Sequence, residues 1–280
     1  MTADIATVRL PDGKSVPCLG QGTWRMGEDS SARKAEIAAL RHGVELGLTL
    51  IDTAEMYGDG GAEKVVGEAF RDLREKVFLV SKVYPQNAGG NALRRACENS
   101  LKRLSTERID LYLLHWRGAV PLKATVEGMT ALQSEGKIGD WGVSNFDASD
   151  MAELLAAGGS ACATNQILYN LLRRGPEFDL LPAMAKRSMP AMAYSPIEQG
   201  RLPNSGVLAE IARRHEATIF QVALAWVLRR PEIIAIPKAA TIAHVAANRA
   251  ALDLKLDADA LAALDKAFAP PKHKTPLAMI

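Results

Sequence analysis

The stretch LTLIDTAEMYG, residues 48–58, decides the fold class of this chain. Residues 48–51 form a short, mainly apolar run of the kind that makes a strand buried on both faces of a parallel sheet. Asp52 ends the run, and Tyr57 follows five residues later. A buried strand that ends in a polar residue and continues into a loop is typical of one βα unit, which carries its chemistry at the carboxyl end of the strand.

The same pattern recurs on both sides of this stretch at intervals of about thirty residues, the length of one βα unit. Apolar runs predict further strands at residues 18–22, 77–80, 109–114, 141–143, 163–167, 191–194 and 233–236. Between them apolar residues return at helical spacing, as Ile37, Leu40 and Val44 do. Eight such units in 280 residues predict an α/β fold, a single (β/α)8 TIM barrel domain over residues 1–280.

The segment before the first barrel strand contains a Pro-Asp-Gly turn at residues 11–13, which predicts an N-terminal β-hairpin. A doubly wound open sheet is the alternative to the barrel. The GxGxxG fingerprint of dinucleotide-binding sheets of that type is incomplete here, because residues 20–22 and 58–60 both lack its third glycine. The closed barrel is therefore favoured.

Composition and cysteine spacing exclude several classes of partner. The net charge of +2 gives no reason to expect nucleic acid or a membrane surface. Cys18, Cys97 and Cys162 lack the spacing of a zinc site, and in His215-Glu216 the HExxH pattern fails at Ile219. No secretory or membrane-spanning pattern is found at the N-terminus. We expect a cytoplasmic monomer or weak oligomer with reduced thiols and no metal.

Four ionisable residues stand at or just beyond three successive strand ends. Asp52 and Tyr57 follow the strand at 48–51, Lys82 follows the next, and His115 the third. Catalytic residues of a barrel gather at the carboxyl ends of its strands. Taken singly, each residue has a structural alternative: a buried Asp52–Lys82 ion pair, a loop tyrosine, or a core histidine.

The residues in and around these strand ends resemble the aldo-keto reductase family. Asp52–Gly58, followed by Glu63 and Gly67, is similar to its first signature, and Lys82 and His115 look like the rest of its Asp/Tyr/Lys/His tetrad. The resemblance runs in order from Gly22 to Asn248 and points to bacterial members that reduce methylglyoxal or diketo-gluconate. It implies an NADP-dependent oxidoreductase that reduces aldehydes, ketones or small dicarbonyls.

The chemistry of carbonyl reduction gives each member of the tetrad a role. Hydride addition leaves an alkoxide, which needs a proton donor. Tyr57 is the candidate donor, and we expect the Lys82 ammonium to lower its pKa from about 10. Asp52 would keep Lys82 charged. His115 can donate a hydrogen bond to the carbonyl oxygen. His42, His215 and His273 are expected on the solvated surface.

The resemblance also implies a cofactor site. It places Gly22 and Thr23 in this site, at the end of the first barrel strand. Ser144, Asn145 and Gln166 would bind the carboxamide of nicotinamide. Tyr194 would stack on the nicotinamide ring. Further contacts are expected from Ser195, Pro196, Ile197, Lys238, Thr241, His244 and Asn248.

One departure from the family pattern affects the choice of cofactor. The family commonly has a hydroxyl residue directly after the lysine at position 238 and an arginine six residues after it, where this chain has Ala239 and His244. Histidine binds a phosphate less firmly than the fork of arginine does. NADPH is expected, with NADH as a weaker alternative.

Aromatic residues near the strand ends suggest the substrate pocket. Trp24, Tyr84, Trp116 and Phe146 are expected to form an aromatic wall. Only residues 269–280 follow the last helix, so we expect an open site for a small carbonyl substrate. Two alternatives remain: a Schiff-base lyase using Lys82 or Lys238, and a non-enzymatic nicotinamide-nucleotide-binding module.

Chelation tests the expected absence of metal chemistry. Because no cluster of potential ligands is found in the sequence, carbonyl-dependent NADPH oxidation should be unchanged after incubation with EDTA. The assay compares the initial rates of NADPH oxidation before and after incubation with EDTA. A loss of activity that zinc or magnesium restores would contradict the mechanism.

Overall fold

The computed structural model describes residues 5–203 and 206–280 and contains an eight-stranded parallel sheet. The sheet runs in chain order, each strand pairing with the next. This arrangement is expected when every strand is followed by a crossover to its neighbour. The strands are β3 (Gln21–Gly22), β4 (Leu50–Asp52), β5 (Phe78–Val83), β6 (Ile109–Leu114), β7 (Ile138–Ser144), β8 (Asn165–Leu168), β9 (Ala191–Tyr194) and β10 (Ile233–Ile236).

The sheet closes into a barrel between its first and last strands. Parallel bridges join Leu19 to Ala235 and Gly22 to Lys238. The N–H of Gly22 donates to the Pro237 carbonyl at 3.0 Å, and a Cβ on Gly22 would lie 2.8 Å from the Ile236 carbonyl oxygen. Only glycine fits this contact, so Gly22 serves the closure of the barrel.

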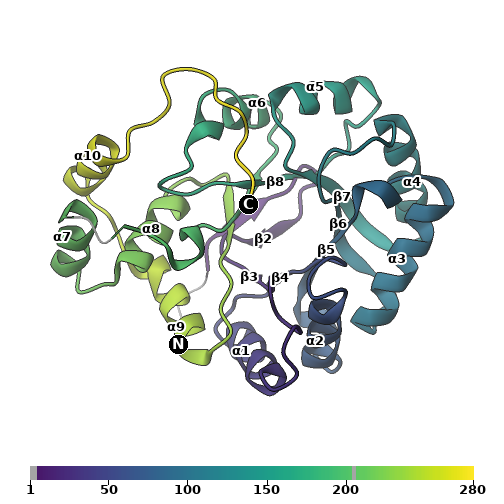
Figure 1. Cartoon of the computed structure of the whole chain (residues 1–280), viewed down its shortest axis with the longest axis horizontal. Coiled ribbons are helices and arrows are strands. Elements are labelled where there is room, and N and C mark those ends of the chain that lie inside the picture. The colour runs from purple at the N-terminus through teal and green to yellow at the C-terminus, as the bar shows by residue number, and fades with distance from the viewer. Residues whose placement is uncertain (1–4, 204–205) are drawn as a thin grey trace.

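A ring of helices surrounds the barrel (Figure 1). The helices are α1 (Arg33–Glu45), α2 (Gly61–Phe70), α3 (Gly90–Leu104), α4 (Leu122–Ser134), α5 (Ala148–Ala156), α6 (Leu180–Ala185), α7 (Gly206–Arg214), α8 (Ile219–Leu228), α9 (Ile242–Ala250) and α10 (Ala258–Ala267). Helices α7 and α10 pack against each other at one side of the ring. Buried apolar residues form one cluster from Val8 to Leu264, which favours the predicted single domain.

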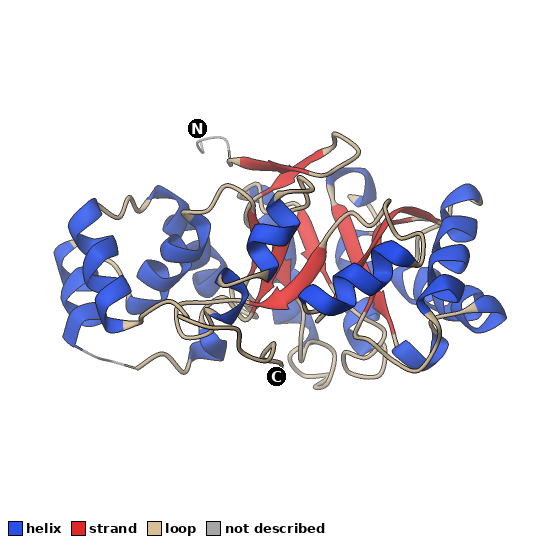
Figure 2. Cartoon of the chain, turned by 90° about the horizontal axis from the view of Figure 1, so that it is seen from above, coloured by secondary structure: helices blue, strands red, loops and turns tan. Residues whose placement is uncertain are grey.

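The predicted hairpin is present ahead of the barrel. Strands β1 (Thr7–Arg9) and β2 (Ser15–Pro17) pair antiparallel. Gly13 has a φ of +92° in the turn between them, a conformation that glycine adopts without strain. Figure 2 shows the hairpin across one end of the barrel, with the C-terminal end of the chain at the other.

The sequence located every barrel strand but misjudged several bounds. The predicted bounds of β6, β9 and β10 are correct, whereas β5 and β7 extend further and β3 is only Gln21–Gly22. Polar residues within a strand explain the difference, since Ser81, Lys82 and Asp140 interrupt the apolar runs yet lie in the ladder. The predicted (β/α)8 barrel is confirmed.

Gly67 provides a test of helix packing around the barrel. A Cβ added to this residue of α2 would lie 2.7 Å from the carbonyl oxygens of Arg103 and Leu104 at the end of α3. We expect Gly67→Ala to reduce the free energy of unfolding by about 1–3 kcal/mol, measured by urea denaturation. The control is Gly206→Ala, because a Cβ added to Gly206 would lie more than 4 Å from the described residues other than its chain neighbours. Equal stability of both variants would contradict the packing described.

Candidate active site

Asp52, Tyr57 and Lys82 are in direct contact at the carboxyl ends of β4 and β5. The Lys82 ammonium donates to Asp52 Oδ2 at 2.7 Å, to the Thr53 carbonyl oxygen at 2.9 Å and to the Tyr57 hydroxyl oxygen at 3.1 Å. Lys82 has no exposed surface, and Asp52 is 2% exposed. An ammonium has three hydrogens, and each has an acceptor here. The position of Lys82 against Tyr57 is therefore fixed.

Lys82 is charged in this buried position. Burial lowers the pKa of an amine, but the Asp52 carboxylate and the Tyr57 oxygen outweigh burial and raise the pKa of Lys82. Burial raises the pKa of Asp52, while Lys82 and the Gln166 amide oppose that change. With 2.7 Å between the charged groups and further hydrogen bonds on both, the ion pair is the stable form.

The pKa of Tyr57 differs from the expectation. Burial raises it, and the Asp52 charge acts in the same direction, while Lys82 opposes both without reversing them. Lys82 acts on the pKa of Tyr57 in the predicted direction, but the net pKa is raised rather than lowered, because the sequence does not reveal the burial of the hydroxyl. The phenol keeps its proton at neutral pH and is available as a donor.

His115 follows β6 and faces Tyr57 edge-on, with 5.8 Å between the ring centroids. Burial, together with the charge of Lys82, holds the pKa of His115 well below its usual value, so the imidazole is neutral. Its Nδ1 is buried and has no hydrogen-bond partner among the described residues. Because a buried N–H without an acceptor is costly, the proton belongs on Nε2, which makes Nε2 the ring's donor.

A chain of polar contacts connects the tetrad to Tyr194 at the end of β9. Gln166 Nε2 donates to Asp52 Oδ1 at 2.7 Å, and the Ser144 hydroxyl donates to the Gln166 carbonyl oxygen at 2.9 Å. Asn145 Nδ2 donates to the Ser144 hydroxyl at 3.1 Å, and the Tyr194 hydroxyl donates to Asn145 Oδ1 at 2.9 Å. The residues predicted to bind nicotinamide thus form one connected unit with the tetrad.

Two predicted site residues lie inside the barrel instead. Phe146 has no exposed surface, and its backbone is bonded to the Asn165 side chain, so the ring belongs to the core. Thr23 is equally buried and its hydroxyl donates to the Asp52 carbonyl oxygen at 2.9 Å. The prediction of a pocket role for Phe146 is wrong, and the Thr23 side chain holds β3 to β4. Burial by neighbours distant in sequence decides both cases.

Of the other predicted aromatic residues, Tyr84 and Trp116 lie near the tetrad. The rings of Tyr84 and Trp116 meet edge-on at 5.9 Å, and Trp116 lies 4.9 Å from the His115 ring. Trp24 is half-buried and carries the Arg25 guanidinium 5.0 Å above its ring. Arg25 has a φ of 64°, which is unusual for a residue other than glycine.

Around the N-terminus of α9 the residues fit a phosphate. Lys238, Thr241 and His244 are all exposed there, and the Thr241 hydroxyl caps the helix by accepting from the His244 N–H at 3.3 Å. Within the described residues, Lys238 has no ion pair or side-chain hydrogen bond. A helix N-terminus beside a free cation attracts anions. Asn248 lies further along the same helix and is half-buried.

The turn after β9 also fits an anionic group. Ser195, Pro196 and Ile197 begin this turn, with Pro196 buried and the other two half-buried. Gln199 Nε2 is a buried donor without a partner in the described part of the chain, while its Oε1 accepts from Arg201 at 2.9 Å. An anionic oxygen would satisfy this donor. These residues fit the phosphate groups of a dinucleotide.

The C-terminal segment, residues 269–280, returns to the site although it is short. It leaves α10, passes α6 and returns over the middle of the barrel, as Figure 1 shows. Lys274 lies 3.5 Å from Asp179 along this path, and the Ile280 backbone approaches the Tyr194 hydroxyl. Burial raises the pKa of Tyr194 to about 12, although the Ile280 contact opposes the rise. The short C-terminal segment therefore reaches the site at Tyr194.

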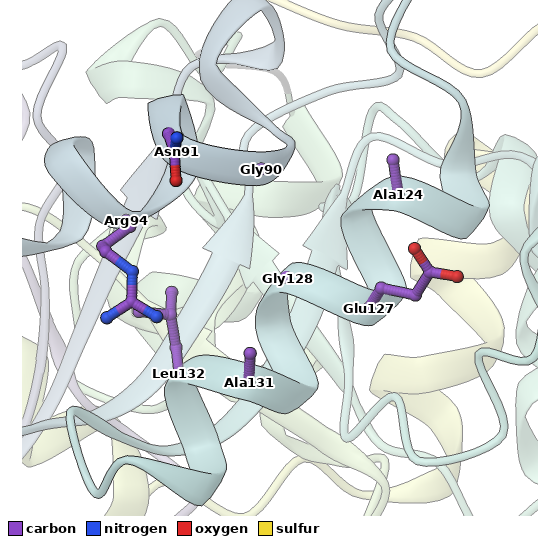
Figure 3. Close-up of a pocket in the computed structure, with 8 residues that line it drawn as sticks. All are labelled: Gly90, Asn91, Arg94, Ala124, Glu127, Gly128, Ala131 and Leu132. Atoms are coloured by element: carbon purple, nitrogen blue, oxygen red, sulfur yellow. The ribbon is translucent and has the colours of Figure 1, made fainter.

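A groove between two helices lies away from the predicted site residues. A groove of about 340 Å³ lies between α3 and α4, lined among others by Asn91, Arg94 and Glu127 (Figure 3), and no predicted site residue borders it. No helix of the described chain is long and apolar enough to cross a membrane.

Surface and buried histidines only partly follow the prediction. His273 is exposed and His42 half-buried, whereas Nε2 of His215 is enclosed without a partner among the described residues. All three cysteines are buried and unpaired, as expected.

Comparisons with known proteins identify the family of the chain. The model of the aldo/keto reductase family matches residues 18–269. The chain belongs to the aldo/keto reductase family. The family resemblance read from the sequence is confirmed.

Relatives within the aldo/keto reductase family include characterised enzymes. The chain is 59% identical to methylglyoxal reductase YeaE of Escherichia coli (strain K12) over 272 residues, which covers 95% of this chain and 96% of that protein. It is 32% identical to glyoxal reductase of Bacillus subtilis (strain 168), covering 93% of each. A solved aldo/keto reductase from Klebsiella pneumoniae, in complex with NADP and acetate, superposes with a TM-score of 0.96 at 53% identity, covering 99% of this chain and all of that one.

The tetrad geometry predicts how activity depends on Tyr57. Tyr57→Phe should lower kcat for carbonyl reduction by at least about 100-fold, because it removes the proton donor, while NADPH affinity stays within about twofold of the wild-type value. Lys82→Met should also lose most activity. The matched control is Tyr169→Phe, which removes a hydroxyl that donates to Glu177 outside the tetrad. Turnover of Tyr57→Phe within tenfold of wild type would show that another group donates the proton.

Proposed function

We propose that this protein is an NADPH-dependent reductase of small aldehydes, ketones and dicarbonyls, acting in the cytoplasm as a monomer or weak oligomer. One observation carries the proposal: a fully buried ammonium, Lys82, is held between the Asp52 carboxylate and the hydroxyl of Tyr57. The site thus presents the protonated phenol of Tyr57, whose hydroxyl oxygen accepts a hydrogen bond from the charged Lys82 ammonium. That arrangement serves the protonation of an alkoxide.

The residues of the chain have separate tasks in this reaction. Bound NADPH supplies the hydride. Tyr57 donates its proton to the oxygen of the former carbonyl, and Lys82 stabilises the tyrosinate that remains. The Nε2–H of His115 orients the carbonyl oxygen, and its neutral state keeps a second positive charge away from Lys82.

The cofactor would be held at two ends of the site. Tyr194, Ser144, Asn145 and Gln166 would hold the nicotinamide, and the turn of Ser195, Pro196 and Ile197 the pyrophosphate. Lys238, Thr241, His244 and Asn248 would bind the adenosine phosphate. The free ammonium of Lys238 at the capped N-terminus of α9 supports this assignment, as does the NADP bound in the Klebsiella pneumoniae structure.

The substrate would be small and uncharged or weakly polar. Tyr84 and Trp116 offer aromatic surface near the tetrad, and the C-terminal segment reaches Tyr194 beside it. The high identity with a methylglyoxal reductase supports a dicarbonyl substrate. NADPH oxidation across a panel of aldehydes, ketones and dicarbonyls tests this; no oxidation with any of them would contradict the proposed function.

Neither alternative function accounts for the site as well. A Schiff-base lyase needs a neutral amine as nucleophile, but Lys82 is fully buried with a raised pKa and donates three hydrogen bonds. Lys238 is exposed and has no ion pair or side-chain hydrogen bond among the described residues. A binding module without activity would not need a buried ion pair directed at a phenol.

Cofactor preference tests the placement of the phosphate site. A charge-assisted contact contributes about 1.5–3 kcal/mol, so Lys238→Ala should lower the NADPH/NADH ratio of kcat/KM by roughly tenfold or more. His244→Arg should raise the ratio, because a guanidinium binds phosphate through two hydrogen bonds. The measurement is kcat/KM for both cofactors in each variant. A ratio that Lys238→Ala leaves unchanged would place the phosphate elsewhere.

A further inference from the structure

The turn after β9 has an unusual backbone for residues other than glycine. Ser195, Glu198 and Gln199 have φ values of 46°, 47° and 55°. Each left-handed residue with a side chain costs on the order of 1 kcal/mol or more. Such a conformation persists only where surrounding groups hold it in place, so the contacts of this turn identify what maintains it.

Asn170 makes the first of these contacts. It lies two residues beyond β8, the neighbour of β9 in the sheet, and has no exposed surface. Its Nδ2 donates to the Ser195 carbonyl oxygen at 2.9 Å and to Glu198 Oε2 at 2.8 Å. Its Oδ1 accepts from the backbone N–H groups of Leu172 and Arg173. The Asn170 amide therefore connects the loop after β8 to the strained turn at two residues, Ser195 and Glu198.

Arg173 makes the second contact and supplies the charge. Its Nη2 donates to Glu198 Oε1 at 2.8 Å, and its Nε lies 3.2 Å from the same oxygen. The Glu198 side chain is 6% exposed and that of Arg173 46%. Burial raises the pKa of Glu198, but the bonds from Arg173 and Asn170 lower it further than burial raises it. Glu198 is thus a buried carboxylate whose ion-pair partner is Arg173, while the charge of Arg201 acts on it from outside this pair.

We propose that Asn170, Arg173 and Glu198 are positioning residues that hold the turn of residues 195–199 ready for the cofactor pyrophosphate, and that Arg173 cancels a negative charge that would otherwise repel it. This inference rests on the proposed function, in which the turn binds the pyrophosphate. None of the three is assigned to touch the reacting atoms.

If Arg173 acts by cancelling the charge of Glu198, removing that charge should restore part of the cofactor affinity that Arg173→Met loses. A purely structural role would not produce this recovery. Arg173→Met removes the ion-pair partner of the buried Glu198 carboxylate, so the dissociation constant of NADP⁺ should rise by about tenfold or more. Glu198→Gln keeps a similar shape without the charge and should weaken binding by less than about threefold. The double variant Arg173→Met/Glu198→Gln should bind more tightly than Arg173→Met alone. Added salt should reduce the defect of Arg173→Met by screening the repulsion.

A comparison of cofactors separates this role from that of Lys238. NAD⁺ and NADP⁺ share the pyrophosphate, so Arg173→Met should weaken both by the same factor, whereas Lys238→Ala should weaken NADP⁺ alone. Equilibrium binding to the unmodified and variant proteins, followed by quenching of tryptophan fluorescence, measures both without turnover. The control is Arg33→Met, which breaks the Arg33–Glu68 ion pair on the surface of α1 and should change neither constant.

The outcomes distinguish this inference from the proposed function. If the unmodified protein binds NADP⁺ and Lys238→Ala weakens it, but Arg173→Met binds like wild type, the positioning role is wrong and the cofactor site stands. A double variant that binds no better than Arg173→Met would likewise overturn the charge argument. If the unmodified protein bound neither nucleotide, the proposed function and this inference would fail together. Thermal melting of each variant checks that it is folded.

Discussion

The buried ion pair of Lys82 and Asp52 is the interaction on which the rest of the site depends. Placing an ammonium and a carboxylate out of water costs several kcal/mol for each ion unless both are paired and fully hydrogen-bonded. Here the ammonium has acceptors in Asp52, Thr53 and Tyr57, while the carboxylate also accepts from Gln166. Satisfying this pair fixes the ends of strands β4, β5 and β8 relative to one another.

From that pair, the order of the site extends outward through polar contacts. Gln166 connects Asp52 to the Ser144 hydroxyl, and Asn145 continues the connection to Tyr194 at the end of β9. Beyond Tyr194, the strained turn is held from the loop after β8. A site that is ordered before a ligand arrives loses less conformational freedom on binding. The barrel therefore supplies a preorganised surface for hydride transfer, with Tyr57 at its centre.

The burial of Tyr57 changes how its role is understood. A lone phenol beside an ammonium would ionise more easily than in water, but this phenol is also partly buried and lies near the Asp52 carboxylate. Burial raises the pKa of Tyr57 more than Lys82 lowers it, so the hydroxyl keeps its proton. The ammonium then acts mainly by stabilising the tyrosinate that forms after the proton has left, which is where an enzyme gains most from a fixed charge.

The sequence by itself determined the barrel and the members of its tetrad, because both follow from one-dimensional patterns. Apolar runs at regular spacing identify strands, and polar residues directly after them mark the carboxyl ends, as Asp52, Lys82 and His115 do. Only the tertiary structure decided which side chains are buried and what they contact. Phe146 and Thr23 belong to the interior, and Asn170 and Glu198 meet across two loops. Burial and strain arise from neighbours far apart in the chain, and no local pattern encodes them.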